Sequence, residues 1–329
     1  MTYDLSLLDK SPLLAGEPAS AALQRTVALA QGAERLGYRR FWVAEHHANP
    51  GLASSAPEVL IAHLAARTQR IRIGSGGVLL PHYSPYKVAE TFNLLATLAP
   101  GRIDLGVGKA PGGLPAATRA LRRLHDPARV PPFDDLLREL DTYLAPPDDA
   151  SPPALPTPPA PPERFLLGAS PDSARSAAER GWRFVFAGQL NGDPRAIEAS
   201  LDAYARAGAE AAPLLAVTAL AAPTSEEARA LTDPLKVVRV TLDDGQSVNL
   251  GSEEQAAEYA RQAGAASYRT EIRKPHVLAG TAEEVHRELD RLQARFGVHE
   301  FIIDTPPSAT AKRLASVTLL AGGAPALAA

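Results

Sequence analysis

Residues 71–113 read IRIGSGGVLLPHYSPYKVAETFNLLATLAPGRIDLGVGKAPGG. This segment begins with an apolar run typical of a β-strand (71–79) and ends with a second such run (103–108). Between them, Val88, Phe92, Leu95 and Ala99 fall at i, i+4, i+7 and i+11, so they share one face of a helix. A strand, a helix and a strand in this order predict a βαβ unit with parallel strands.

The same alternation extends over the rest of the chain. Eight runs have the composition of strands, at residues 3–8, 40–44, 71–79, 103–108, 164–169, 184–187, 214–221 and 301–304. The T-x-x-E spacings at 224–227 and 281–284 predict helix starts, and Gly181 and Gly297 stand where helices are expected to end. Eight βα units predict an α/β fold, a closed (β/α)₈ TIM barrel, formed as a single domain over residues 1–329.

Two segments exceed what such a barrel needs, since about 250 residues are typical. Residues 146–162 contain nine prolines in 17 positions, which favours an extended insertion, with a domain linker as the alternative. Residues 233–277 are too long for a plain connection. We expect a mobile lid over the catalytic face there, centred on residues 268–274. A small ordered subdomain with a hairpin turn at Asp243-Asp244-Gly245 is the alternative.

Composition excludes several kinds of chemistry. The 329 residues include no cysteine, so disulfides, thiolate metal sites and cysteine nucleophiles are excluded. A net charge of −3 without a basic block argues against nucleic-acid binding. The first residues lack a signal-peptide pattern, and the longest apolar stretches are shorter than the ~20 residues of a spanning helix. We therefore expect a cytoplasmic protein that does not bind membranes.

Catalytic side chains are expected after the carboxyl ends of the barrel strands. Glu45-His46-His47 follows the second strand and supplies imidazoles that can transfer protons near neutral pH, unless they only bond to the backbone. We expect no metal, because adjacent histidines do not converge easily on one ion. Gly76-Gly77 interrupts an apolar strand, which indicates either a barrel bend or a close approach of the backbone to a flat ligand.

Two further segments have the chemistry of an anion site. GVGKAPGG (106–113) exposes backbone N–H groups and adds the positive charge of Lys109, although it is neither a Walker nor a Rossmann sequence. Ser170 and Ser173 open the helix expected after the fifth strand, where hydroxyls and free N–H groups can bind an anion. Helix capping alone is the alternative explanation for one of these serines.

These stretches together resemble the bacterial luciferase-like flavin-dependent monooxygenase family. The resemblance rests on FWVAEHH (41–47), on residues 71–113, on LLGASPDSARSAAERG (166–181) and on VLAGTAEEV (277–285). It implies a TIM barrel, usually dimeric, that binds reduced FMN at the carboxyl ends of its strands. It further implies reaction of the flavin with O₂ to give a C4a-peroxyflavin, with a separate NAD(P)H:flavin reductase as partner.

The family pattern also assigns site residues. His46 matches the catalytic histidine, and Gly76-Gly77 matches a non-prolyl cis peptide beneath the flavin ring, so we expect valine at Gly77 to weaken flavin binding more than folding. Lys109 stands where arginine is usual, and Ala169 stands where the luciferase subunit has a carboxylate. The positions expected to bind the cofactor are Ser75, Gly76, Gly77, Lys109, Ser170 and Ser173.

The expected activity is oxygenation of a small organic substrate such as an aldehyde. Two alternatives remain at this point. One is a deazaflavin-dependent hydride-transfer enzyme that uses the same end of the barrel. The other is a flavin-binding homologue without catalytic activity, which the departures at Lys109 and Ala169 favour.

Overall fold

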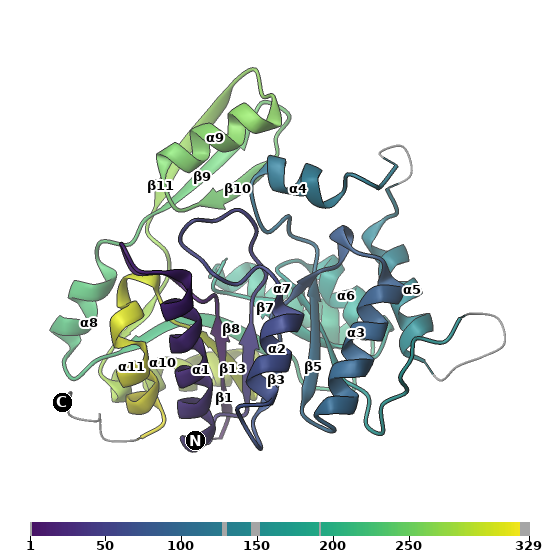
Figure 1. Cartoon of the computed structure of the whole chain (residues 1–329). Coiled ribbons are helices and arrows are strands. Elements are labelled where there is room, and N and C mark those ends of the chain that lie inside the picture. Colours follow the sequence, from purple (N-terminus) through teal and green to yellow (C-terminus); the bar gives the residue numbers. More distant parts are fainter. Residues whose placement is uncertain (1, 127–129, 146–151, 191, 323–329) are drawn as a thin grey trace.

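The computed structural model describes residues 2–126, 130–145, 152–190 and 192–322 of the chain (Figure 1). Its centre is a closed barrel of eight parallel strands, in which each strand pairs with the next and the last pairs with the first. The strands are β1 (Asp4–Asp9), β2 (Arg40–Val43), β3 (Arg72–Ser75), β5 (Ile103–Gly108), β6 (Glu163–Gly168), β7 (Arg183–Ala187), β8 (Leu214–Ala221) and β13 (Glu300–Asp304). The predicted TIM barrel is confirmed. A short strand, β12 (Leu278–Gly280), pairs with the end of β8.

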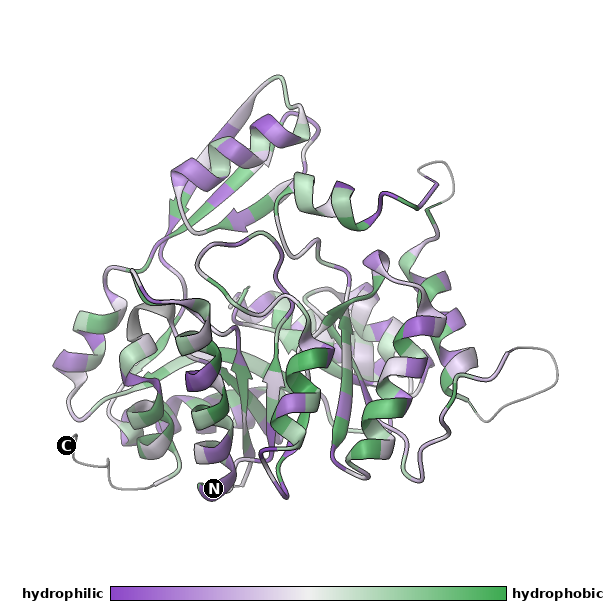
Figure 2. Ribbon diagram, in the orientation of Figure 1, coloured by the Kyte–Doolittle hydropathy of each residue, from purple (hydrophilic) through white to green (hydrophobic). Residues whose placement is uncertain are grey.

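Helices surround the barrel, and each larger one places an apolar side toward the strands. Figure 2 shows hydrophobic and hydrophilic stretches on the same helices, as expected for elements with one face on a core. On α3, for example, the predicted residues Val88, Phe92 and Leu95 are buried. The helices around the barrel are α1 (Ala19–Arg35), α2 (Pro57–Ala65), α3 (Pro85–Leu98), α5 (Phe133–Leu144), α6 (Pro171–Glu179), α7 (Pro194–Arg206), α8 (Ser225–Thr232), α10 (Ala282–Phe296) and α11 (Arg313–Leu320).

Local side-chain chemistry sets several helix ends. Thr281 and Glu284 form the predicted capping box at the start of α10, and Gly297 ends that helix in the left-handed conformation. Thr224 accepts a hydrogen bond from the backbone N–H of Glu227 at the start of α8. These ends are determined by residues that the sequence pattern identifies.

The predicted third strand is divided at the glycine pair. β3 pairs with β5 as far as Gly74, and the short strand β4 (Val78–Leu79) resumes the pairing at Val78. Three residues of the divided strand thus face two of β5, which is the count of a bulge. The Gly76-Gly77 peptide bond is cis, as the resemblance implies.

Ser75 bridges the interruption between the two strands. Its Oγ donates to the carbonyl oxygen of Gly106 at 2.8 Å and accepts from the N–H of the same residue at 3.0 Å. The backbones approach closely here, because a Cβ atom on Gly77 would lie 2.7 Å from the Gly106 carbonyl oxygen. A valine at Gly77 would therefore meet backbone within the barrel wall and should cost folding stability as well. The expectation that it weakens flavin binding more than folding stays a prediction.

The Pro-rich segment connects α5 to β6. Residues 146–151 lie outside the described residues, while residues 152–162 form neither helix nor strand. This part packs on α3, since Asn93 Nδ2 donates to the carbonyl of Ala154 at 2.7 Å and Tyr86 Oη donates to that of Pro153 at 3.2 Å. It links two elements of the same barrel.

Residues 233–277 fold into a small ordered unit, which we call the cap subdomain. Its antiparallel sheet has the order β10 (Ser247–Leu250), β9 (Val237–Leu242), β11 (Tyr268–Arg273), with α9 (Glu253–Ala263) packed on it. Asp243-Asp244-Gly245 forms the predicted hairpin turn. The ordered subdomain, which is the alternative to a plain lid, is thus what the structure shows, and its movement as a lid stays a prediction. It has its own apolar cluster of Val238, Val240, Leu242, Ala256, Tyr259 and Ala260.

The cap subdomain follows β8 and reaches the segment after β5, across the carboxyl end of the barrel (Figure 1). That segment carries α4 (Pro115–Leu121), which has no buried residue. Gln262 of α9 accepts a hydrogen bond from the N–H of Ala116 through Oε1 (2.8 Å) and one from Arg119 through its carbonyl oxygen (2.9 Å). A cleft of about 520 Å³ lies between the two parts, lined by residues that include Pro111 and Tyr259.

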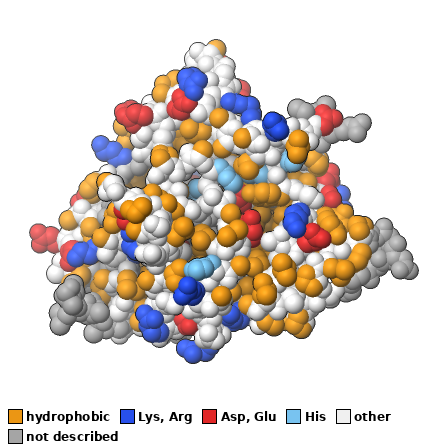
Figure 3. All heavy atoms as spheres, viewed as in Figure 1, with side chains coloured by type: hydrophobic (Ala, Val, Ile, Leu, Met, Phe, Trp, Pro, Cys, Tyr) orange, Lys and Arg blue, Asp and Glu red, His pale blue; other side chains and the backbone are white. Residues whose placement is uncertain are grey.

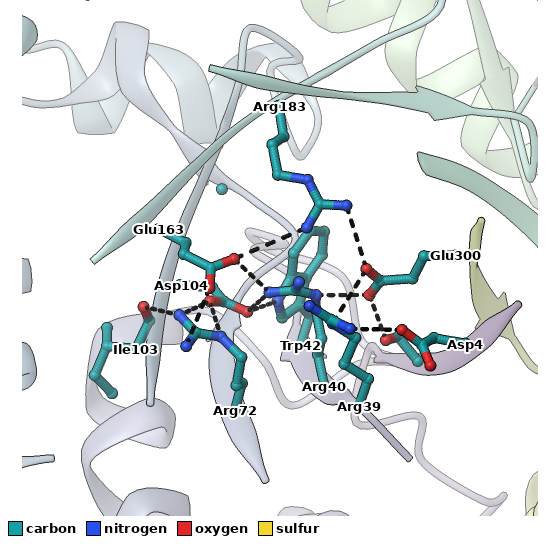
Figure 4. A network of polar contacts seen from close by, with 12 residues as sticks. Asp4, Arg39, Arg40, Trp42, Arg72, Ile103, Asp104, Glu163, Arg183 and Glu300 are labelled. Atoms are coloured by element: carbon teal, nitrogen blue, oxygen red, sulfur yellow. Dashed lines mark hydrogen bonds and ion pairs between the residues drawn. The ribbon is translucent and has the colours of Figure 1, made fainter. Parts of the chain in front are cut away.

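The opposite end of the barrel is filled by charged side chains (Figure 4). Arg40, the first residue of β2, is fully buried. Its Nε donates to Glu300 at 2.6 Å, and its Nη1 donates to Asp104 at 2.9 Å and to Glu163 at 3.0 Å. A guanidinium group needs such partners in the interior, because the effective cost of its desolvation is several kcal/mol.

Further partners complete the network at this end. Trp42 Nε1 donates to Asp104 at 2.9 Å, and Arg72 contacts the same carboxylate at 2.6 Å. Burial acts to raise the pKa of Glu163, but the charges of Arg40 and Arg72 outweigh it and lower that pKa. Glu163 therefore stays ionised, and its carboxylate contacts arginines of β2 and β3.

Replacing Arg40 by methionine should lower the free energy of unfolding by about 3–5 kcal/mol, because it removes the fully buried cation that contacts Asp104, Glu163 and Glu300 together. Urea denaturation followed by circular dichroism measures this loss. The matched control is Arg39→Met at the neighbouring position, where the side chain is 46% exposed and should contribute less than about 1 kcal/mol. Equal losses in the two variants would contradict a central role for the buried guanidinium.

Candidate functional site

Four predicted site segments meet at the carboxyl end of the barrel, which we call the mouth. They follow β2, β3, β5 and β6, which are consecutive neighbours in the sheet. His46, Gly76-Gly77, Lys109 and Ser170 therefore lie along one part of the rim in this order. Figure 3 shows histidine side chains in the hollow below the cap subdomain.

His46 lies half-buried just after β2. Its backbone N–H donates to the carbonyl oxygen of Ser54 at 2.8 Å, and its buried ring atom Nδ1 has no hydrogen-bond partner among the described residues. Burial lowers the pKa of His46 to about 4, and the positive charge of Lys10 acts in the same direction. The imidazole is therefore neutral at neutral pH and has one unused polar atom.

Glu45 organises the loop that carries His46. This carboxylate is 3% exposed and accepts three hydrogen bonds: from the N–H of Leu79 (2.9 Å), from Tyr83 Oη (2.7 Å) and from His47 Nε2 (2.7 Å). Burial and the Glu45 carboxylate both raise the pKa of Tyr83, so its hydroxyl stays protonated. The sequence assigns no role to Glu45 or Tyr83, although both flank predicted site segments.

His82 extends this polar network toward α4. Its Nδ1 accepts from Arg122 Nε at 3.2 Å, so Nε2 carries the proton and donates to the carbonyl oxygen of Pro111 at 3.0 Å. Burial lowers the pKa of His82, which keeps this ring neutral. The ring also lies edge-on to His47, with centroids 5.9 Å apart. The segment after β5 is thereby joined to the segment after β2.

An anion site can form where α6 begins. Ser170 is the N-cap of α6, with its Oγ 3.4 Å from the N–H of Ser173 and 3.1 Å from the Ser173 hydroxyl. Lys109 is exposed just after β5, the strand that pairs with β6. Asp172 in the first turn is paired with Arg175 at 3.0 Å, which offsets its repulsion of an anion. A cation, a hydroxyl and helix N–H groups thus come from adjacent strands.

Two predicted cofactor residues are mainly structural. Ser75 has no exposed surface, and both functions of its hydroxyl are used by Gly106. Ser173 is buried, and its Cβ would lie 2.6 Å from a Cβ atom on Gly168. Gly76 and Gly77 are partly exposed, which leaves backbone without side chains at the mouth.

The described part of the chain contains neither a metal-binding cluster nor a membrane-spanning helix. No group of three or more His, Asp or Glu residues there is arranged to hold a metal ion. No helix there is long and apolar enough to cross a bilayer.

Comparison with known proteins agrees with this geometry. The family model described as luciferase-like monooxygenase matches residues 4–300. The chain belongs to this family. It is 46% identical over 325 residues to the N-acetyl-S-alkylcysteine monooxygenase of Bacillus subtilis (strain 168), with 96% of both chains covered. The protein is accordingly an enzyme, an oxidoreductase of the monooxygenase class.

Solved structures have the same fold. The crystal structure of apo-MsnO8 is 33% identical, has a TM-score of 0.76 and covers 97% of this chain and 98% of its own. The oxygenating constituent of 3,6-diketocamphane monooxygenase from Pseudomonas putida, in complex with FMN, has a TM-score of 0.70. It is 20% identical, covering 99% of this chain and 98% of its own, so this likeness concerns the fold alone.

The ring of His46 should titrate with a pKa near 4 in NMR of the ¹⁵N-labelled protein. Because this value lies below the ordinary 6.5, the unfolded chain binds the proton first as the pH falls. His46 therefore destabilises the fold progressively between about pH 6.5 and pH 4. A pKa between 6 and 7 would contradict the buried, neutral ring.

Proposed function

We propose that the enzyme is a flavin-dependent monooxygenase that uses reduced FMN and O₂ to oxygenate a small organic substrate. One observation carries the proposal: Lys109 and the start of α6 follow adjacent strands, on the same rim as the neutral ring of His46, whose Nδ1 has no hydrogen-bond partner in the described part of the chain. This arrangement offers an anion site and a proton-transfer group at opposite ends of a stretch of bare glycine backbone.

The residues present fit FMN. Lys109, Ser170 and the first N–H groups of α6 would hold the phosphate, and Gly76-Gly77 would leave room for the flat ring. When bound, reduced FMN would supply the electrons that activate O₂. The cap subdomain and α4 would exclude water from the mouth.

His46 would manage the proton at the reacting centre. A neutral imidazole can accept a proton at one nitrogen or donate one from the other, and Nδ1 has no hydrogen-bond partner among the residues that the structure describes. Glu45 would act through position, since it holds the loop that presents His46. In this motif, His46 would transfer the proton and Glu45 would hold the loop in place.

A thioether is the first substrate class to test. The Bacillus subtilis relative is named for N-acetyl-S-alkylcysteine, and the two chains match almost from end to end. In the balanced reaction, one oxygen atom of O₂ enters the substrate and the other leaves as water, while reduced FMN is oxidised. An aldehyde remains the second class, because the resemblance by itself implies no thioether.

The working assembly would be a homodimer in the cytoplasm, supplied by a separate NAD(P)H:flavin reductase. An exposed apolar surface on α2 and α3 supports self-association, since Val59 is 64%, Leu94 49% and Leu98 69% exposed. This surface lies on the outside of the barrel, on the helices between β2 and β5. It would leave the mouth open to substrate.

Replacing Lys109 by alanine should raise the Kd for reduced FMN by about tenfold, as expected for the loss of one hydrogen bond to a charged group. Lys109→Arg should keep or tighten binding, because its guanidinium can contact phosphate through two N–H groups. Anaerobic titration calorimetry measures both constants, with Lys87→Ala on the outer surface of α3 as the matched control. Unchanged affinity in Lys109→Ala would place the phosphate elsewhere.

Replacing His46 by glutamine should retain binding of reduced FMN while lowering product formation about 100-fold or more, the range expected for loss of a proton-transfer group. Product is measured with N-acetyl-S-methylcysteine and with a linear aldehyde, and His63→Gln on α2 is the control. Full activity of His46→Gln with either substrate would remove His46 from the chemistry. Tighter binding of a deazaflavin than of reduced FMN by the unmodified enzyme would instead favour hydride transfer.

A further inference from the structure

The strand β11 forms an unpartnered edge of the cap subdomain. It pairs with β9 on one side, and within the described ranges no strand pairs with its other side. All six of its residues are exposed. An edge of this length offers a row of backbone N–H and C=O groups to another strand.

The side chains of β11 alternate between the two faces of its sheet. Tyr268 and Ile272 share the face on which β9 packs beneath α9, yet they remain 46% and 53% exposed. Arg269 and Glu271 lie on the opposite face. The apolar layer of the sheet therefore continues beyond the helix that covers it.

The sequence of β11 is complementary to itself in one register. If two copies run antiparallel about a two-fold axis at Thr270, Tyr268 faces Ile272 of the other copy, Arg269 faces Glu271, and Thr270 faces its own equivalent. Facing side chains in an antiparallel ladder point to the same side, so both apolar pairs lie on the α9 face. Aromatic with β-branched, opposite charges, and threonine with threonine are the pairings that stabilise sheets.

The neighbouring registers are unfavourable. An axis at Arg269 would place this residue opposite its own equivalent. An axis at Glu271 would place Glu271 opposite its own equivalent and Arg269 opposite Arg273. Like charges directly opposite each other destabilise a sheet. An axis at Ile272 also faces opposite charges, Glu271 with Arg273, but it leaves only three facing pairs within β11. The register at Thr270 is thus the longest one without facing like charges.

We propose that β11 pairs with β11 of a second copy of this chain, which joins two three-stranded sheets into one of six strands. The occupant is a second copy because the complementarity in charge and shape is internal to the strand. A ladder of five facing pairs is small compared with the ~1,200–2,000 Å² of a stable interface, so the association is weak and depends on concentration. It couples two cap subdomains and thereby the covers of two mouths.

Charge exchange within the strand tests the pairing. Arg269→Glu and Glu271→Arg each replace both attractive pairs by repulsive ones, so each variant alone should self-associate about tenfold more weakly through β11. A mixture of the two variants restores both pairs, since each strand then carries a single sign of charge. The double variant Arg269→Glu/Glu271→Arg also restores them within one chain.

Sedimentation velocity of the full chain over a wide concentration range measures this step. Controls are Glu283→Arg and Arg287→Glu on α10, which exchange the charges of another exposed pair. Both single variants keep the α2–α3 surface, so any dimer formed there is present throughout. Mixing the two variants does not repair the contacts that each substitution changes within its own cap subdomain. Recovery of association in the mixture therefore reports pairing between copies.

The proposal predicts weaker association for each single variant and recovery for the mixture and the double variant. Single variants that associate as the unmodified chain does would overturn it, and the charges would then serve only to protect an exposed edge. Weakening without recovery in the mixture would also overturn it. The proposal would also be overturned if the unmodified chain self-associates no more strongly than the two single variants do.

Discussion

The buried guanidinium of Arg40 is the interaction on which the barrel most depends. It contacts carboxylates at the amino ends of β5, β6 and β13 from the first residue of β2, so one side chain joins strands around the barrel. Because a buried cation is costly without its carboxylate partners, the strands that carry these carboxylates must stay within reach of Arg40. The amino ends of these strands are thereby held together at one end of the barrel. The residues that follow their carboxyl ends then lie close together at the mouth.

At the mouth, polar side chains and backbone groups are connected by hydrogen bonds. Glu45 accepts three hydrogen bonds and holds the loop after β2, while His46 beside it has an atom without a partner among the described residues. Glu45 can therefore support the loop, while the Nδ1 atom of His46 is available for chemistry. The Arg122–His82 contact extends the support to α4, which in turn contacts the cap subdomain. The cover of the mouth and the loop carrying His46 are thus parts of one connected network.

Periodicity and turn chemistry predict most of the fold. The eight strands and the capping box at Thr281 follow from local patterns, and the third strand is divided at the glycine pair that marks it in the sequence. The Arg40 network does not follow, because a charged residue at a strand start is also typical of an exposed end. For the site, position after a strand indicates His46 and Lys109, but it cannot show that the Ser75 hydroxyl is used by Gly106. The length of residues 233–277 and the turn at Asp243-Asp244-Gly245 indicate the cap subdomain, but strand β11 within it is not predicted, since its six residues contain no apolar run.

The most direct test of the account is a crystal structure of the enzyme with FMN. The account predicts the phosphate within hydrogen-bonding distance of Lys109 Nζ and Ser170 Oγ, with the flavin ring against Gly76-Gly77 and on the same side of the mouth as His46. A phosphate bound away from α6, or a flavin bound outside the mouth, would contradict it.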